Sequence, residues 1–161
     1  MFVLARAVTY ASLFIGFVLI LLPARILSST GITQPAPSGV LQVAGMLVGA
    51  AGAALALTCI FTFAFVGRGT PAPFDPPRRL VVRGPYRLLR NPMYAGAGLA
   101  LAGAALSYQS IALLGYAAVF LVVMHAFVVL YEEPTLRRMF GKEYEAYCRQ
   151  VGRWWPLTPR R

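Results

Sequence analysis

The chain has 161 residues, of which 58% are hydrophobic and only 12% are charged. A soluble domain usually carries about 25% charged residues, so this composition excludes an ordinary soluble enzyme and an intrinsically disordered chain. The 15 basic residues outnumber the five acidic ones and give a net charge of +10. In so apolar a chain, we interpret the positive excess as a sign of contact with a membrane surface rather than with nucleic acid.

Two charge-free runs in the N-terminal half are long enough to cross a bilayer as helices, which takes roughly 20 residues. No convincing cleavage site follows the first run, 7–24, so we expect a retained span rather than a signal peptide. The second run, 40–66, contains small residues that would let another helix approach closely, unless they only reflect a general richness in alanine and glycine. These residues are Gly45, Gly49, Ala53 and Ala56.

A basic segment, 67–91, separates these runs from a second apolar part. It holds six arginines, and its prolines exclude a continuous helix, so we expect an irregular loop at the membrane surface. Apolar residues return at 92–106 and at 111–130, on either side of four polar residues, and this pattern predicts a helical hairpin. The chain is therefore expected to span the membrane four times.

The arginines predict the orientation of these spans. With four spans and a cytoplasmic N-terminus, 14 of the 15 basic residues lie on the cytoplasmic side and only Arg25 lies outside. An odd number of spans would place the N-terminus on the other side, and Arg6 alone is weak evidence against it. In either case the basic loop and the C-terminal tail share one face. We expect a multi-pass protein of the cytoplasmic (inner) membrane with both segments in the cytoplasm.

The tail is expected to begin with an amphipathic helix over 134–151, whose apolar residues recur at intervals of three and four. They are Leu136, Phe140, Tyr144, Tyr147 and Val151. This helix would lie on lipid headgroups or fold back over the basic loop. The prediction is an all-α integral membrane bundle in one domain, 1–161, with two N-terminal spans (1–66), the loop (67–91), the hairpin (92–130), and a cytoplasmic helix and tail (131–161).

Several side chains in the second apolar part are candidates for chemistry. Glu132 and Glu133 lie where the last predicted span ends, either to pair with arginines or to face a cationic ligand. His125 lies on the same side of that helix as Glu132, where it would hydrogen-bond another helix or take part in a site. Asn91 and Pro92 form a good helix start, a role that needs no function.

Several familiar sites are missing from the sequence. It has no Walker loop, no histidine spacing typical of a metal site and no nucleic-acid module, so we expect neither a metal nor a nucleic-acid partner. Cys59 lies in an apolar run and Cys148 in the basic tail. Such different settings argue against a disulfide and against a zinc site with cysteine ligands.

Four short pieces, in order, carry a resemblance to a known family. Residues 84–96 read GPYRLLRNPMYAG and 132–136 read EEPTL, while 140–147 read FGKEYEAY and 151–156 read VGRWWP. They are similar to the isoprenylcysteine carboxyl methyltransferase family, which is related to the membrane phospholipid methyltransferases. The resemblance covers 84–156, whereas the N-terminal half shows only hydrophobicity.

The resemblance implies a membrane enzyme that transfers a methyl group from S-adenosylmethionine directly to a lipophilic acceptor at the cytoplasmic face. In that family the hairpin, the loop before it and the C-terminal helix enclose the cofactor, while the acceptor comes from the bilayer. We expect Arg90, Asn91 and Glu132 to be the catalytic residues. The expected cofactor-binding residues are Tyr86, Arg87, Arg90, Asn91, Tyr94, Gly96, Glu132 and Glu133.

The chemistry of these residues agrees with the implied cofactor. A carboxylate, from Glu132 or Glu133, would accept hydrogen bonds from the cofactor's ammonium or ribose. An arginine, Arg87 or Arg90, would bind its carboxylate. Gly96 would give it room against the hairpin, and the two tyrosines, at 86 and 94, would contact its adenine or sulfonium.

One departure from the family pattern concerns Asn91, where the carboxyl methyltransferases commonly have histidine. Asparagine does not titrate near neutral pH, so a proton-accepting role at this position is excluded. A carboxylate or thiolate acceptor is already anionic and needs no base, which favours such an acceptor, or a base supplied by a glutamate. A lipid headgroup with an amine would need a base, and His125 is the chain's one imidazole.

Two other functions fit part of this pattern. Membrane sterol reductases, which bind NADPH, have a similar hairpin start and a Tyr-Cys pair like residues 147–148, but the adjacent glutamates and the short chain favour the methyltransferase. A non-catalytic membrane scaffold would use the same motifs only to pack and cap helices. The partners that we expect are membrane lipids and, for the methyltransferase, a lipophilic small molecule or a lipidated acceptor.

Overall fold

The structure, a computed structural model, describes residues 9, 12–35, 39–63, 65 and 80–157. All of its named elements are helical, as the sequence predicts. In chain order they are η1 (Ile15–Leu21), α2 (Leu22–Ser29), α3 (Val40–Thr62), η3 (Gly84–Arg87), α4 (Pro92–Ser107), α5 (Ile111–Phe127), η4 (Val128–Glu132), α6 (Glu133–Phe140) and α7 (Lys142–Gln150). Of these, η1 and η4 are π-helical and η3 is a 3₁₀ turn.

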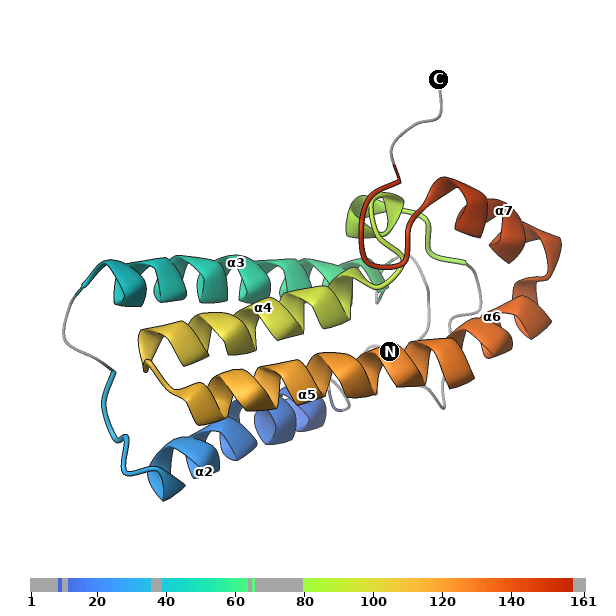
Figure 1. Cartoon of the computed structure of the whole chain (residues 1–161). Coiled ribbons are helices and arrows are strands. Elements are labelled where there is room, and N and C mark those ends of the chain that lie inside the picture. Colours follow the sequence, from blue (N-terminus) through green and yellow to red (C-terminus); the bar gives the residue numbers. More distant parts are fainter. Residues whose placement is uncertain (1–8, 10–11, 36–38, 64, 66–79, 158–161) are drawn as a thin grey trace.

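Among the described residues, three continuous helices are long and apolar enough to cross a membrane, namely Ser12–Ser29, Val40–Thr62 and Ile111–Phe140. The fourth apolar helix, Pro92–Ser107, is shorter. Figure 1 shows α3, α4 and α5 side by side, with α2 next to α5. The predicted all-helical fold, with three to four helices that could span a membrane, is confirmed.

The first span differs from the predicted run, 7–24. Its described part continues through Pro23 and Arg25 to the end of α2. Pro23 directly follows the first residue of α2, where the π-helical η1 ends, so the continuous helix passes this proline at a change of helix type. The beginning of the predicted run lies outside the described residues.

The last span also continues beyond its predicted end at residue 130. The π-helical η4 carries the chain through Glu132, and the same continuous helix passes Pro134 into α6. The prediction of a single helix over 134–151 is wrong. Gly141, with a φ of 49°, separates α6 from α7, because glycine adopts this left-handed conformation at little cost.

Small residues bring α3 and α4 into close contact. A Cβ atom on Gly52 would lie 2.5 Å from the backbone nitrogen of Ala100, and one on Gly96 would lie 2.8 Å from the Gly52 carbonyl oxygen. The small residues of α3 therefore form a packing face, as one of the two interpretations predicts. This face consists of Gly45, Gly49, Gly52 and Ala56, whereas Ala53 is exposed.

The polar segments gather at one end of the bundle, where α3 ends and α4 begins (Figure 1). Tyr144, Tyr147 and Val151 form a buried cluster against Leu80, so α7 folds back over the loop segment, as one of the two predicted placements has it. The Tyr147 hydroxyl donates to the Tyr86 carbonyl at 2.6 Å. Burial raises the pKa of the Tyr147 phenol above its ordinary value, which keeps this donor neutral.

We expect Gly52→Ala to lower the free energy of unfolding by about 1–3 kcal/mol, because the added methyl group would meet backbone atoms of α4. Gly115→Ala is the matched control, since a Cβ atom at Gly115 has nothing within 4 Å. It should leave stability unchanged or raise it, because alanine favours helix more than glycine does. Thermal unfolding in one detergent measures both, and equal stability of the two variants would contradict the close contact of α3 with α4.

Candidate functional site

The segment after α7 pairs with the approach to α4. We name residues 151–157 the strap. Leu89 and Gly152 form a parallel β-bridge, and the Arg90 amide donates to the Gly152 carbonyl at 2.9 Å. The first and last of the four motif pieces, far apart in sequence, therefore meet at the start of the hairpin.

Asn91 precedes α4 and Pro92 is its first residue, as the sequence predicts. The Asn91 side chain, however, makes no capping hydrogen bond. Its backbone, with φ of −125° and ψ of 51°, lies outside the β region in which capping side chains usually reach the helix. Asn91 is 6% exposed, and its Nδ2 donates to the Arg153 carbonyl at 3.3 Å. The residue thus forms a second link between the strap and the hairpin.

Glu133 is 3% exposed and lies against three arginines from three segments. From the strap, Arg153 donates Nε to Oε1 at 2.6 Å and Nη2 to Oε2 at 2.9 Å, which makes a bidentate pair. From the approach to α4, Arg90 donates Nη1 to Oε1 at 2.9 Å. Arg137 of α6 places its Nη2 3.7 Å from Oε2. This geometry favours arginine pairing as the role of Glu133, and a cofactor contact for it stays a prediction.

Glu132, the preceding residue, has a different partner. It is half-buried at the end of η4, and its Oε2 accepts a hydrogen bond from the Tyr94 hydroxyl at 3.2 Å. Successive helical residues project about 100° apart, which separates the two carboxylates. Within the described residues, the ion pairs go to Glu133 and none goes to Glu132. The Glu132 carboxylate is therefore available to a cationic ligand.

Arg90 is nearly buried and joins two segments. Besides its bond to Glu133, its Nη1 donates to the Cys148 sulfur at 2.9 Å. The Nε of Arg90 is buried and has no hydrogen-bond partner among the described residues. Buried donors of this kind are uncommon, so Nε is a candidate donor for the anionic group of a ligand. Arg87, the other predicted arginine, is exposed at the end of η3.

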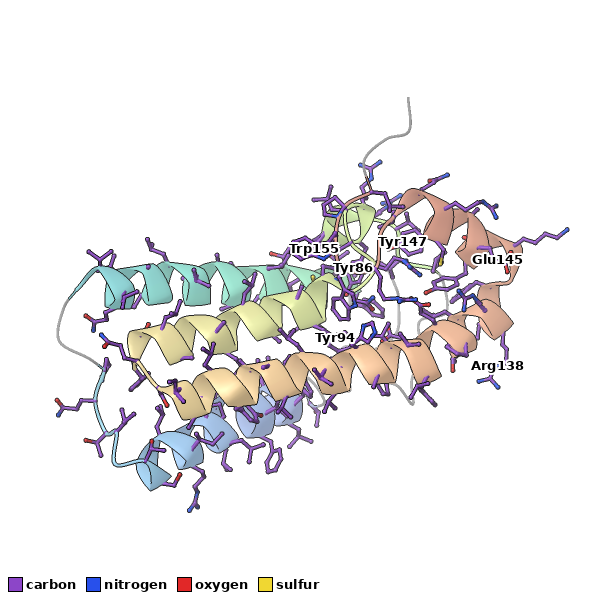
Figure 2. The ribbon with its side chains drawn as sticks, viewed as in Figure 1. Tyr86, Tyr94, Arg138, Glu145, Tyr147 and Trp155 are labelled. Atoms are coloured by element: carbon purple, nitrogen blue, oxygen red, sulfur yellow. The ribbon has the colours of Figure 1, made fainter. Side chains whose placement is uncertain are left out.

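Tyr86 and Gly96, also predicted for the site, are buried in packing contacts. The Tyr86 ring lies 5.4 Å from the Phe63 ring, and burial raises the pKa of its phenol well above the ordinary value. Gly96 faces Gly52 of α3. Figure 2 shows Tyr86 and Tyr94 at the polar end of the bundle. Cofactor contacts by Tyr86 and Gly96 stay predictions.

His125 of α5 contacts the strap. The Trp154 Nε1 donates to the His125 Nδ1 at 2.9 Å, and the two ring centroids lie 6.1 Å apart. His125 is exposed on its helix. This matches the interpretation of His125 as a hydrogen-bonding partner, with the strap in place of the expected second helix.

Sequence reasoning did not assign Arg153, Trp154 and Cys148 to the site. Their contacts join segments that lie 20 to 58 residues apart, so no helical period reveals them. The signal that was present is their position within, or directly beside, the last two motif pieces.

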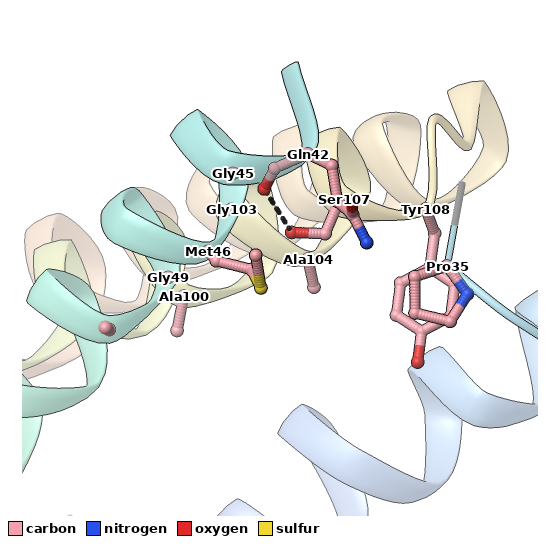
Figure 3. Close-up of a pocket in the computed structure, with 11 residues that line it drawn as sticks. Pro35, Gln42, Gly45, Met46, Gly49, Ala100, Gly103, Ala104, Ser107 and Tyr108 are labelled. Atoms are coloured by element: carbon pink, nitrogen blue, oxygen red, sulfur yellow. Dashed lines mark hydrogen bonds between the residues drawn. The ribbon is translucent and has the colours of Figure 1, made fainter. Parts of the chain in front are cut away.

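A cavity of about 370 Å³ lies between α3 and α4, at the other end of these helices (Figure 3). Ser107, which lines it, follows Tyr94 by 13 residues, or about 20 Å along α4. None of the residues that line the cavity is charged. The cavity is therefore separate from the carboxylates and arginines of the candidate site.

The model of one protein family, described as phospholipid methyltransferase, matches residues 40–143 of the chain. The match runs from the start of α3 into α7 and includes the whole hairpin and both glutamates. No curated protein and no solved structure matches the chain. The family match confirms the relationship that the four motif pieces indicate.

We expect Arg153→Ala to lower the free energy of unfolding by about 1–3 kcal/mol, because Glu133, which is buried, loses two charge-assisted hydrogen bonds. Arg138→Ala is the matched control. Arg138 is exposed and contacts the Thr135 hydroxyl, so its loss should change stability by less than about 0.5 kcal/mol. Unfolding of both variants in the same detergent provides the comparison. Equal losses of unfolding free energy in the two variants would show that the hydrogen bonds from Arg153 of the strap do not stabilise the buried Glu133.

Proposed function

The chain belongs to the phospholipid methyltransferase family, and from this premise we propose that it transfers methyl groups from S-adenosylmethionine to a lipophilic acceptor. The family is one of methyltransferases, and the long apolar helices fit an enzyme embedded in a membrane. The observation that carries the proposal is the presence of two unsatisfied groups at one end of the hairpin. Among the described residues, the Glu132 carboxylate has no ion-pair partner, and the buried Arg90 Nε has no hydrogen-bond partner.

The charges of the cofactor complement these two groups. S-adenosylmethionine carries an ammonium and a sulfonium cation together with a carboxylate. Glu132, held by Tyr94, would accept hydrogen bonds from the cationic part. Arg90 would bind the carboxylate through Nε, and its other contacts, to Glu133 and Cys148, fix its position. The residues present therefore fit this cofactor. Of the two arginines considered for the carboxylate, the burial of Arg90 favours it over Arg87.

When bound, the cofactor would supply a methyl group made electrophilic by the sulfonium. The residues of the chain would act by positioning. The Tyr94 hydroxyl orients the Glu132 carboxylate, and the strap holds Arg90 through Glu133. An acceptor held in line with the bond from methyl to sulfur would attack the methyl carbon with its lone pair, while the methyl–sulfur bond would break and leave its electron pair on the sulfur of S-adenosylhomocysteine. Alignment and the exclusion of water would contribute most of the rate gain.

The choice of acceptor depends on which group takes a proton. Asn91 cannot do so, and its amide is occupied with the Arg153 carbonyl. An acceptor that is already anionic, such as a carboxylate or thiolate, requires no base. A neutral acceptor, such as the amine of a lipid headgroup, would require one, and we propose Glu132 for this role because no arginine pairs with it in the described structure.

The polar end of the bundle is proposed to face the cytoplasm. The described parts of the basic loop and of the tail meet there, as the bridge between Leu89 and Gly152 demonstrates (Figure 1). Positively charged segments favour the cytoplasmic side of a membrane. The proposed partners are the surrounding membrane lipids and a lipophilic small molecule or lipidated acceptor.

We expect Glu132→Gln to weaken the binding of S-adenosylhomocysteine about tenfold or more, because the amide loses the charge that would bind the ammonium. Isothermal titration of the purified protein in detergent measures the change in Kd. Glu145→Gln is the matched control, since Glu145 is exposed on α7 (Figure 2) and should keep the wild-type Kd. An unchanged Kd in Glu132→Gln would remove Glu132 from the site.

S-adenosylhomocysteine is also expected to stabilise the protein against heat. At 100 times its Kd, a ligand that binds only the folded state adds about 2.7 kcal/mol, whereas NADPH should leave Tm unchanged. A Tm that rises with NADPH alone would instead indicate a reductase. A Tm that responds to neither compound would indicate a scaffold without a cofactor.

A further inference from the structure

The strap and the candidate site connect the same two continuous helices, α4 and the helix Ile111–Phe140 that comprises α5, η4 and α6. The strap links the start of α4 with α5 and α6, through its bonds to Asn91, His125 and Glu133. Tyr94 and Glu132 likewise join α4 to the end of η4. Among the described elements, the routes to Glu132 that run along α4 lie between α4, α5 and the strap, and between α4 and α3.

The two seams between helices are closed by direct packing. Between α3 and α4, a Cβ atom on Gly96 would lie 2.8 Å from the Gly52 oxygen, so the two backbones touch two residues after Tyr94. Between α4 and α5, a Cβ atom on Gly98 would lie 2.5 Å from a methyl group of Leu121. Opening either seam would separate the packed helices themselves.

The strap is held firmly along two of its edges. Towards α4, the edge is a backbone bridge, in which the Arg90 amide donates to the Gly152 carbonyl. Towards α6, the edge is the bidentate pair of Arg153 with Glu133, a carboxylate that is 3% exposed. Breaking the second edge would leave a buried charge with fewer partners, which is costly.

The third edge of the strap, towards α5, is held differently. In the described structure it is closed by one side-chain hydrogen bond, from Trp154 to His125, and by the contact of their rings. His125 is exposed, and Val122, one turn away on the same helix face, is 68% exposed. Both residues belong to a helix long and apolar enough to span the membrane, so we expect this edge to face lipid.

We propose that the seam between α5 and the strap is the portal through which the acceptor passes from the bilayer to Glu132, and that Trp154 and His125 form its gate. This inference rests on the proposed function and adds the location of the acceptor's path. The acceptor is an amphiphile. Its apolar chain stays among the lipids beside α5, while its nucleophile passes the Trp154–His125 bond. The gate opens when that bond breaks, with Arg153 and Gly152 still holding the other two edges.

A reversible cross-link across the gate tests this portal. The variant His125→Cys/Trp154→Cys is joined by a short reagent with two thiol-reactive, reducible ends. Methyl-labelled S-adenosylmethionine is then added to membranes that contain the protein, and label in the lipid extract is measured. We expect the cross-link to lower the transfer at least tenfold, and reduction to restore it. The Kd for S-adenosylhomocysteine should change less than twofold, because the cofactor's own groups remain in place.

The single variant His125→Cys and the wild type, treated alike, control for reaction at Cys59 and Cys148. Transfer at the same rate with and without the cross-link would overturn the portal while leaving the proposed function intact. Failure of the wild type to bind S-adenosylhomocysteine would instead overturn the proposed function.

A second measurement needs no double variant. The chain has two tryptophans, so Trp155→Phe leaves Trp154 as its single indole fluorophore. The protein is placed in phosphatidylcholine vesicles with brominated acyl chains. We expect the brominated chains to quench Trp154 fluorescence more strongly than aqueous iodide does. Adding His125→Leu should increase the quenching by bromine, because the strap edge is released. Stronger quenching by iodide than by bromine would mean that the seam opens to water, and would overturn the proposal.

Discussion

The buried carboxylate of Glu133 is the interaction on which the rest of the site depends. A carboxylate that is 3% exposed is stable only if cations and hydrogen bonds replace its water. Here the cations come from the approach to α4, from α6 and from the strap. Because one anion binds all three, it fixes the start of the hairpin, the end of the last span and the C-terminal segment relative to one another. Packing of small residues holds α3 and α4 together, but it does not place the strap.

The engagement of Glu133 gives its neighbour a separate role. The two glutamates are adjacent in sequence, yet one binds arginines and the other binds a tyrosine hydroxyl. The π-helical η4 ends at this point, and such turns are frequent at functional sites. With Glu133 committed to the arginines, no ion pair goes to Glu132 in the described part of the chain, and we propose that Glu132 binds a cation while the surplus positive charge of the cluster binds an anion. Part of the arginine excess thus binds Glu133, in addition to the effect expected of the arginines on the orientation of the spans.

Much of the fold could be predicted from the sequence, because a bilayer demands long apolar helices and the positions of charges and prolines mark their ends. The hairpin start at Pro92 and the turn before Ile111 follow from these rules. The continuation of the last helix past residue 130 does not, since a π-turn leaves no pattern in hydropathy. The break at Gly141 was also hidden, because a single glycine is compatible with either a helix or a turn.

The candidate site could be predicted as a set of residues but not as a set of contacts. Two adjacent glutamates look equivalent in sequence, and only the fold assigns Arg153 to one and Tyr94 to the other. The role of Gly96 was equally ambiguous, because the sequence does not distinguish a glycine that makes room for a ligand from one that makes room for a neighbouring helix. Its contact with Gly52 depends on the register of α3 against α4, which local sequence does not encode.

We propose that S-adenosylmethionine binds between the start of α4 and the end of η4. Ultraviolet cross-linking of methyl-labelled S-adenosylmethionine to the protein in its membrane, followed by mapping of the labelled peptide, tests it most directly. We expect the label in peptides that contain Arg90 to Tyr94 or Glu132, and we expect excess S-adenosylhomocysteine to abolish it. Label that resists this competition, or that falls on the helix ends around Gln42 and Ser107, would contradict the claim.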